Sequence, residues 1–481
     1  MASEKFYITT SIPYLNGPSH IGHALEFVQA DAIARYQRII RKEVFFLTGS
    51  DEHGATIVKA AEKTGKNPDE FVNSLVVVFR KLLNSLHISN DDFIRTSDKK
   101  RHWPGAKLLW QKLVESGDIY KGFYKGLYCI GHEAYVTEKD LENGLCVLHK
   151  TPPEEIQEEN YFFKLSKYTS AIREKITSGE LKILPEFRSQ ETINALTEIG
   201  DISFSRPQKD ISWGIPVPGD DTQTMYVWCD ALSNYISALG FGSSDDSKFK
   251  QYWPADVQVI GKDILKFHAI FWPAMLLSAG LPLPRTIFVH GFINMKGEKM
   301  SKTVGNVMDP FPLIEKYGAD AVRFYLLHEV ATFGDSDYSD EHFHEVYNGS
   351  LVNGLGNLVS RVTKMVENVG GVEKDEEDQG LKAMKDSYHR RMKNYEIGEA
   401  IRFVWKMLHE MDEYIEQHKI YKLVKENPED AKKKLGSSNL FIGLETIAEL
   451  ITPFLPETAE KMHLALKNPS ERVHLFPRIE K

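Results

Sequence analysis

The chain has 481 residues, of which 42% are hydrophobic and 26% are charged; this composition excludes a disordered or collagen-like protein and allows about three folded domains. Its three cysteines exclude a disulfide framework and favour a reducing, cytoplasmic location, and the apolar run 269–283 is broken by two prolines, which excludes it as a membrane span. The formal net charge of −9 excludes a uniformly basic nucleic-acid-binding protein, so any RNA-facing surface must be a local basic patch.

The first segment predicts a strand, a turn and a helix. Residues Lys5–Thr10 are β-branched and aromatic, and they begin too early in the chain for us to expect a secretory leader. After a turn with two prolines, apolar residues recur at helical spacing from Ser19, which is placed to cap the helix. This order is half of a nucleotide-binding βαβ unit, whose helix N-terminus can bind phosphate. His20 and His23 lie in the first helical turn, although two solvated polar residues would look the same.

A second strand precedes a polar cluster. The apolar run Val44–Thr48 predicts a buried strand, and Asp51, Glu52 and His53 follow it. In an open parallel sheet, residues at the carboxyl end of a strand lie at the binding site. The alternative is that these residues cap the helix that follows. Residues 67–116 are predicted to be helical and to complete this half of the fold.

Residues 117–224 predict an insertion, because the strand signals there are short and turns are frequent. The region contains two Cys-x-x-His pairs, and paired ligands of this type indicate a zinc site. Four protein ligands leave no open coordination position, so the zinc would be structural. The alternative is a knuckle that has lost its metal and is held by apolar packing. The four candidate ligands are Cys129, His132, Cys146 and His149.

A third buried strand is predicted at Val257–Ile260, with Gly261 and Asp263 at its carboxyl end. Two helical faces carry apolar and aromatic residues: Trp228, Ala231 and Tyr235 before this strand, and Phe267, His268 and Trp272 after it. Taken alone, such faces are ordinarily core packing.

The segment Lys299-Met300-Ser301-Lys302-Thr303 places two lysines three residues apart, and alone it would be an ordinary charged loop. From Asn348 to Lys481 the sequence is almost entirely helix-periodic. Within this region Asn357 and Arg361 share one helical face, for which a solvated surface is the plain alternative.

Together, His20-Ile21-Gly22-His23 after a strand and Lys299 to Thr303 resemble the two signature motifs of class I aminoacyl-tRNA synthetases. The residues between them are most similar to the methionyl-tRNA synthetase family, and the resemblance covers nearly the whole chain. It implies an α/β fold: a Rossmann-type nucleotide-binding catalytic domain, split by a connective-peptide insertion and followed by an all-α anticodon-binding helical bundle. The implied domains are 1–116 and 225–290 for the two catalytic halves, 117–224 for the connective peptide, 291–347 for the stem-contact region with the lysine loop, and 348–481 for the anticodon-binding domain.

The resemblance also implies a reaction, that of a methionine-tRNA ligase. L-methionine is activated with ATP to methionyl-adenylate and pyrophosphate, and the methionyl group then passes to the 3′ end of tRNA(Met). The implied cofactors are ATP with Mg²⁺, and a structural Zn²⁺. No membrane partner is expected, and a monomer is favoured because the chain ends near its helical bundle.

The resemblance assigns roles to the candidate residues. The implied catalytic residues are His20, His23, Lys299 and Lys302, which bind ATP together with Gly22, Gly261 and Asp263. The implied methionine-binding residues are Ile12, Tyr14, Asp51, Trp228, Ala231, Tyr235, Phe267, His268 and Trp272, with Asp51 receiving the α-ammonium group. The implied anticodon-binding residues are Asn357, Arg361 and Tyr421.

The sequence departs from the family pattern in two places. His132 stands where the family knuckle usually has cysteine, which puts the ligand set in question. Ile420-Tyr421 stands where the family has a proline and a tryptophan that stacks on an anticodon base. Tyrosine can also stack on a base. Arg206 matches an arginine of the connective region, to which spacing assigns no role.

Three alternatives belong to neighbouring classes. A cysteine-specific synthetase would hold its zinc in the catalytic domain, whereas these Cys/His pairs lie in the insertion. A small nucleotidyltransferase would lack the helical region after Asn348. A non-catalytic tRNA-binding relative would have little reason to retain His20, His23, Lys299, Lys302 and Asp51 together. The insertion is also too short for the editing domain that synthetases for leucine, isoleucine and valine carry there.

Overall fold

The computed structural model describes residues 4–132, 134–136, 140–295, 297–300, 307–374, 376–471 and 473–480. Its internal contacts divide the chain into two compact units. The first consists of Met1–Ser19, Arg41–Lys81 and Asn90–His290, and the second of His20–Ile40, Leu82–Ser89 and Gly291–Lys481. Within the described ranges, no helix combines the length and the apolar character that crossing a membrane requires.

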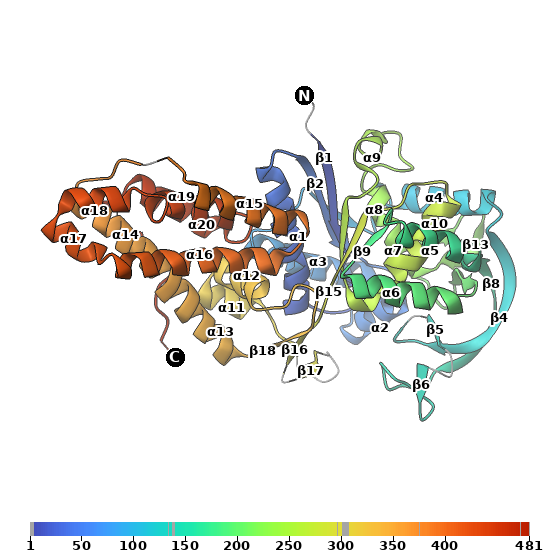
Figure 1. Cartoon of the computed structure of the whole chain (residues 1–481). Coiled ribbons are helices and arrows are strands. Elements are labelled where there is room, and N and C mark those ends of the chain that lie inside the picture. The colour runs from blue at the N-terminus through green and yellow to red at the C-terminus, as the bar shows by residue number, and fades with distance from the viewer. Residues whose placement is uncertain are drawn as a thin grey trace. The chain divides into compact units, whose positions relative to one another are not determined.

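The centre of the first unit is a six-stranded parallel sheet (Figure 1), and this confirms the predicted Rossmann-type α/β fold. Its order is β3 (Asp92–Arg95), β2 (Glu43–Ser50), β1 (Lys5–Thr10), β14 (Val257–Gly261), β15 (Thr286–His290) and β9 (Lys182–Leu184). The chain runs outward from β1 through β2 to β3, and outward on the other side from β14 to β15. The order therefore reverses between β1 and β14, and ligands of open α/β sheets bind at such a switch point.

Helices of the first unit pack apolar side chains against this sheet. The core joins Tyr7 and Leu47 of the strands to Trp110, Tyr235 and Trp272 of the helices. The helices are α2 (Ala55–Lys63), α3 (Pro68–Ser85, which ends in the second unit), α4 (Trp103–Glu115), α5 (Thr169–Thr177), α6 (Glu186–Ala195), α7 (Val227–Leu232), α8 (Asn234–Ser237), α9 (Ser247–Tyr252) and α10 (Trp272–Ser278).

The prediction of continuous helix over 67–116 is wrong in its middle, where β3 pairs with the end of β2. A strand of four residues is too short to show an alternating pattern, so its sequence does not distinguish it from the helices on either side.

The short strands predicted for 117–224 are present, but two strands of this region are long. β4 (Ile119–Cys129) and β8 (Glu154–Phe163) form a long antiparallel ribbon (Figure 1) in a sheet with β5 (Ala134–Val136) and β10 (Ile202–Ser203). The smaller sheets of this region contain β6 (Leu141–Glu142), β7 (Leu145–Cys146), β11 (Ser205–Pro207), β12 (Pro216–Val217) and β13 (Asp220–Met225). In addition, β9 lies within 117–224 but pairs with β15, so part of the predicted insertion completes the main sheet.

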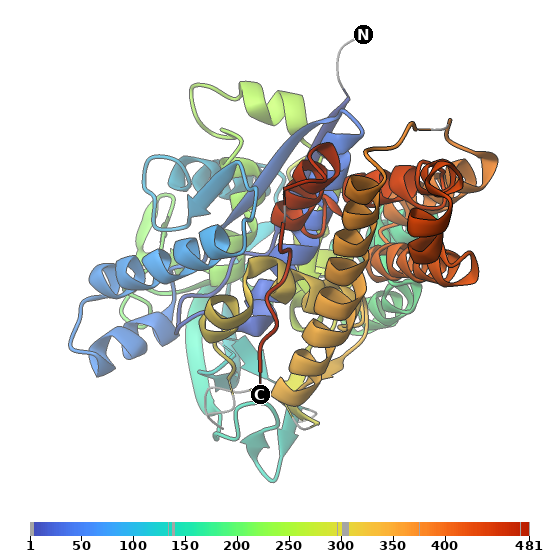
Figure 2. The same ribbon diagram turned by 90° about the vertical axis from the view of Figure 1, so that its left-hand side faces the viewer.

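The second unit is mostly helical, as predicted for the sequence from Asn348 onward. It contains α1 (Ile21–Ile39), β16 (Ile293–Met295), β17 (Glu298–Lys299), α11 (Phe311–Tyr317), α12 (Ala319–His328), β18 (Ser336–Tyr338), α13 (Asp340–Val346), a π-helix (Tyr347–Gly356), α14 (Asn357–Asn368), α15 (Gln379–Lys393), α16 (Ile397–Gln417), α17 (Ile420–Glu426), α18 (Pro428–Leu435), α19 (Phe441–Ile451) and α20 (Pro456–Lys467). After α20 the chain is extended (Figure 2), and the Tyr347 hydroxyl donates to the carbonyl of Pro477.

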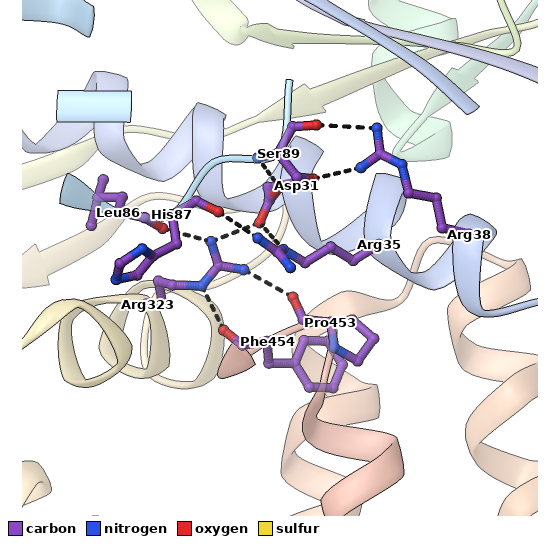
Figure 3. Close-up of polar contacts among 9 residues, drawn as sticks. All are labelled: Asp31, Arg35, Arg38, Leu86, His87, Ser89, Arg323, Pro453 and Phe454. Atoms are coloured by element: carbon purple, nitrogen blue, oxygen red, sulfur yellow. Dashed lines mark hydrogen bonds and ion pairs between the residues drawn. The ribbon is translucent and has the colours of Figure 1, made fainter. Parts of the chain in front are cut away.

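A buried ion pair holds α1 to α12 inside this unit (Figure 3). The guanidinium of Arg323 lies 2.7 Å from the carboxylate of Asp31, and both side chains are 0% exposed. Burial opposes ionisation of Asp31, but Arg323 and Arg35 outweigh it and lower the pKa of this carboxyl group. Asp31 also accepts hydrogen bonds from the amide and hydroxyl of Ser89. The pair is therefore a fully desolvated charge cluster with its hydrogen bonds satisfied.

The remaining donors of Arg323 reach two other segments (Figure 3). One donates to the carbonyl of Leu86, and the others to the carbonyls of Pro453 and Phe454 in the turn between α19 and α20. A single side chain thus connects α12 to α1, to the segment before Ser89 and to the C-terminal helices.

Candidate active site and metal centre

The first turn of α1 presents two imidazoles. The predicted cap at Ser19 is wrong, because the N-cap is His20, whose Nδ1 accepts a hydrogen bond from the Gly22 amide at 3.2 Å. The His20 amide donates in turn to Nδ1 of His23 at 3.1 Å, and the two rings stack with centroids 3.7 Å apart. A ring nitrogen that accepts carries no hydrogen, so in each neutral ring the hydrogen lies on Nε2. The helix start therefore combines its own positive dipole end with two N–H donors, a combination suited to phosphate oxygens.

Gly22 packs closely against one of these rings. A Cβ atom at position 22 would lie 3.0 Å from the His20 ring. A larger residue would therefore require the His20 ring to shift by a few tenths of an ångström.

The described residues on either side of the lysine segment include Lys299, in a strand, and Met308, beside the first turn of α1. β17 pairs Lys299 with Asn294 of β16, while Lys302 falls in 301–306, outside the described residues. The carbonyl of Met308 accepts a hydrogen bond from the Ile21 amide at 3.0 Å.

In the first unit, the loops after β1 and β2 pair with each other. The Asp51 amide donates to the carbonyl of Pro13, and the Asp51 carbonyl accepts from the Leu15 amide, both at 2.9 Å. Tyr14 thus lies beside Asp51, and Ile12 packs against the core below them. The N-cap of α2 is Gly54, which has no side chain to accept from the helix amides, so no residue of the cluster 51–53 occupies the N-cap position.

The aromatic residues of the two helical faces meet in the same unit. The Trp228 ring stacks on Phe267 with centroids 3.7 Å apart. The Tyr235 hydroxyl lies 2.7 Å from Nε2 of His268, and its ring lies 6.0 Å from Trp272. Tyr235 and Trp272 are fully buried in the core, whereas Trp228 and Phe267 are partly exposed at its edge.

The His268 imidazole is neutral, because burial lowers its pKa to about 4. Its Nδ1 lies 3.0 Å from the carbonyl of Ile264, so the ring hydrogen is on Nδ1 and Nε2 accepts from Tyr235. The aromatic group around it therefore carries no charge.

Phe267–Phe271 is a π-helix, which sequence reasoning did not predict. Pro273, in the first turn of α10, has no amide hydrogen to donate back along the helix. The missing donor favours a local change of hydrogen-bond register, and such bulges are frequent at functional sites. Proline soon after an aromatic helical face was the signal in the sequence.

The carboxyl end of β14 lies at the switch point, and that of β15 lies next to it. Gly261 and His290 are register partners there, and a Cβ at Gly261 would lie 2.9 Å from the carboxylate of Asp263. Glycine thus allows the Asp263 carboxylate to approach the end of the strand closely. His290 was not predicted, although its position directly after a buried strand was a usable signal.

The four predicted metal ligands lie together. Their ligand atoms are all within 4.8 Å of one another. Nδ1 of His149 lies 3.8 Å from Sγ of Cys129 and 3.6 Å from Sγ of Cys146, and Nδ1 of His132 lies 3.5 Å from Sγ of Cys146. Around tetrahedral zinc, sulfur and nitrogen ligands are about 3.6 Å apart. The four donors and their spacing therefore fit Zn²⁺, with His132 as a ligand where the family knuckle usually has cysteine.

Two further features suit the metal. Burial lowers the pKa of His132, which keeps its imidazole neutral. A Cβ at Gly131 would lie 2.4 Å from the His149 ring, so only glycine allows this ring to close the site.

Comparison with known proteins covers nearly the whole chain. The family described as "tRNA synthetases class I (M)" matches residues 6–142 and 131–363, and "Anticodon-binding domain of tRNA ligase" matches residues 380–480. A methionine–tRNA ligase of Listeria innocua is 42% identical over 97% of this chain and 74% of its own length. One from Brucella melitensis is 40% identical over 98% of this chain and 93% of its own length. The chain belongs to the methionyl-tRNA synthetase family.

Solved structures of this family have the same fold. Methionyl-tRNA synthetase of Mycobacterium tuberculosis in complex with methionyl-adenylate matches with a TM-score of 0.90 and 36% identity, over 99% of this chain and 100% of that one. The apo form of the same enzyme matches with a TM-score of 0.85 and 33% identity, over 100% of this chain and 99% of that one. The predicted Rossmann-type fold with a helical C-terminal region is thus confirmed.

The three residues for which the family resemblance implies anticodon binding lie on helices of the second unit. Asn357 is exposed at the start of α14. Arg361, one turn later, is not simply solvated: it donates to Asp412 and to Glu416 of α16, each at 2.6 Å. Tyr421 is 41% exposed on α17.

Proposed function

We propose that the chain activates L-methionine with ATP and transfers the methionyl group to tRNA(Met), the activity after which its relatives are named. The observation that carries the choice of amino acid is the uncharged aromatic group around His268 in the unit that also holds Asp51. Aromatic rings contact a polarizable thioether favourably, and a carboxylate pairs with the α-ammonium group. Ile12, Tyr14 and Ala231 complete the proposed methionine site.

For the first step, the methionine carboxylate attacks the α-phosphorus of ATP and expels pyrophosphate. The protein supplies position and charge rather than covalent chemistry. His20 and His23 donate from Nε2 to phosphate oxygens at the N-terminus of α1. The ammonium groups of Lys299 and Lys302 stabilise the negative charge that develops on the departing pyrophosphate. Gly261 and Asp263 receive the ribose, as acidic residues do in nucleotide-binding folds.

ATP would carry Mg²⁺, which would supply positive charge to the phosphates. For the second step, the methionyl group passes from the adenylate to the terminal adenosine of the tRNA. Asn357, Arg361 and Tyr421 contact the anticodon, where single-stranded bases can be hydrogen-bonded and stacked. Exposed Lys422, Lys425 and Lys433 on α17 and α18 supply the local positive charge that an acidic chain needs there.

The layout proposed for these steps is a catalytic domain in two halves, 1–116 and 225–290, with the connective peptide 117–224 between them. The stem-contact region is 291–347 and the anticodon-binding domain is 348–481. The protein is proposed to act as a cytoplasmic monomer.

The test is amino-acid-dependent ATP–pyrophosphate exchange with each of the twenty amino acids. Exchange driven by methionine alone is expected. Exchange driven by cysteine would support the cysteine-specific alternative, and none with any amino acid would indicate a non-catalytic relative.

Cys129, His132, Cys146 and His149 would hold one Zn²⁺, whose role is to stabilise the knuckle. Replacing Cys146 with serine is expected to abolish zinc binding, measured as metal per chain by mass spectrometry, because zinc in such sites needs its thiolates. Cys229, buried in the core away from this cluster, is the matched control, and Cys229→Ser should keep one zinc per chain. Equal zinc contents in the two variants would exclude the proposed ligand set.

Replacing Glu416 with glutamine is expected to strengthen binding of tRNA(Met). The Glu416 carboxylate holds Arg361 and repels phosphate, and a surface ion pair of this kind is worth about 0.2–1 kcal/mol, or up to about fivefold in affinity. The measurement is filter binding at a fixed salt concentration. Glu413→Gln removes the same charge from the same helix but pairs with His409, so it should change affinity less.

A further inference from the structure

A buried carboxylate in the first unit joins two histidines that are distant in sequence. Asp230 of α7 is 1% exposed. Its Oδ2 lies 2.6 Å from Nδ1 of His53, and its Oδ1 lies 2.7 Å from Nε2 of His102. The other ring nitrogen of His102 lies 2.8 Å from the hydroxyl of Ser237. The family resemblance assigns no catalytic or binding role to any of these four residues.

The carboxylate is ionised. Burial opposes its ionisation, but His53 and His102 outweigh it and lower the pKa of Asp230. A carboxylate only accepts hydrogen bonds, so His53 carries a hydrogen on Nδ1 and His102 carries one on Nε2. Both oxygens of Asp230 are therefore engaged, and only the bond from His53 joins the helix to the loop after β2.

The hydrogen bond between His53 and Asp230 joins two segments of the proposed methionine site. His53 follows Asp51 by two residues, in the loop after β2. Asp230 follows Trp228 by two residues and directly precedes Ala231. The hydrogen bond between them thus connects the loop proposed to bind the ammonium group to the helix proposed to line the side-chain pocket.

The His53 ring has little freedom to turn. The rings of Trp103 and Trp213 pack edge-on against it, with centroids 6.1 and 5.5 Å away. Trp213 also donates from its indole nitrogen to the carbonyl of Glu52, and this anchors the loop one residue before His53. A ring held in this way keeps the loop and Asp230 at a fixed separation.

We infer that His53 and Asp230 are positioning residues for methionine, which set the separation between Asp51 and the aromatic wall at Trp228. This inference rests on the proposed function. Methionine is gripped at two ends, its ammonium group and its thioether, and a fixed separation favours a side chain of one length. A displacement of about 1 Å at such a site can cost about 100-fold.

The experiment measures KM for methionine and for ATP in pyrophosphate exchange. His53→Ala is expected to raise KM for methionine by about tenfold or more and to change KM for ATP by less than about threefold. His53→Asn puts an amide donor near the position of Nδ1, so it should restore most of the loss. A purely structural role would lower the melting temperature without this separation of the two KM values.

His102→Ala is the matched control, because it removes an imidazole from the same carboxylate but comes from the segment before α4. Its KM for methionine should move by less than about threefold. Asp230→Asn preserves volume and serves if His53→Ala does not fold, and the same rise in KM is expected.

Two outcomes would overturn the inference: an unchanged KM for methionine in the folded His53→Ala or Asp230→Asn chain, or equal rises in the His53→Ala and His102→Ala chains. If the unaltered chain shows no methionine-dependent exchange, the proposed function fails instead, so the two failures are distinguishable.

Discussion

Replacing Lys302 with alanine is expected to slow methionine-dependent ATP–pyrophosphate exchange by about 10²–10³-fold while KM for methionine stays nearly constant. The ammonium group is proposed to meet charge that develops on pyrophosphate as it leaves. Its loss therefore raises the energy of the transition state without removing a contact to methionine. Steady-state exchange over a range of methionine and ATP concentrations measures both quantities.

The control for this substitution is Lys461→Ala, which removes a positive charge from the exposed face of α20. It should leave exchange unchanged. A rate in the Lys302 variant within about threefold of the unaltered chain would remove this lysine from the mechanism.

Replacing Arg323 with methionine is expected to destabilise the second unit by about 3–5 kcal/mol, because it leaves the Asp31 carboxylate buried without its main counter-ion. Hydrogen exchange of peptides from α1 and α12 measures the effect, and protection should fall by about 10²–10³-fold. Arg361→Met is the matched control. Arg361 also pairs with two carboxylates, but its side chain is 30% exposed, so the cost should be at most about 1 kcal/mol.

Lowering the pH should reduce the difference in free energy of unfolding between the unaltered chain and the Arg323→Met chain. The pKa of Asp31 is lowered in the folded protein, so its contribution to stability is present above the unfolded pKa of about 3.9 and is lost as the pH falls through the lower folded value. The double variant Asp31→Asn/Arg323→Met should be more stable than Arg323→Met alone, because no unpaired charge remains. If the difference in stability between the two chains does not depend on pH, it arises from packing and not from the ion pair.

The sequence predicted the strands that carry the site. β1, β2 and β14 are apolar runs bounded by turns, and each is long enough to show its character. β3 and β9, of four and three residues, are too short, and only the pairing of distant segments reveals them. Capping was also mispredicted at α1, because serine is the usual cap and a histidine in that role depends on a second histidine three residues later.

Within the site, the sequence predicted groups that lie close along the chain or match a family motif. It did not predict the contact of Asp230 with His53 and His102, which are 177 and 128 residues away. No local pattern marks such a contact, because the fold alone brings these residues together. The π-helix before Pro273 was missed for another reason: apolar spacing does not distinguish it from an α-helix.

The position of Arg323 limits how the protein can be dissected. A fragment that stops before Pro453 would lack two of the backbone carbonyls to which Arg323 donates, and also the Thr458 amide that donates to Asp320. Each buried donor left unmatched costs about 1–3 kcal/mol. Truncation before Pro453 should therefore yield an insoluble or molten product, and residues 453–481, with α20, are better treated as part of the packing around α12 than as a removable module.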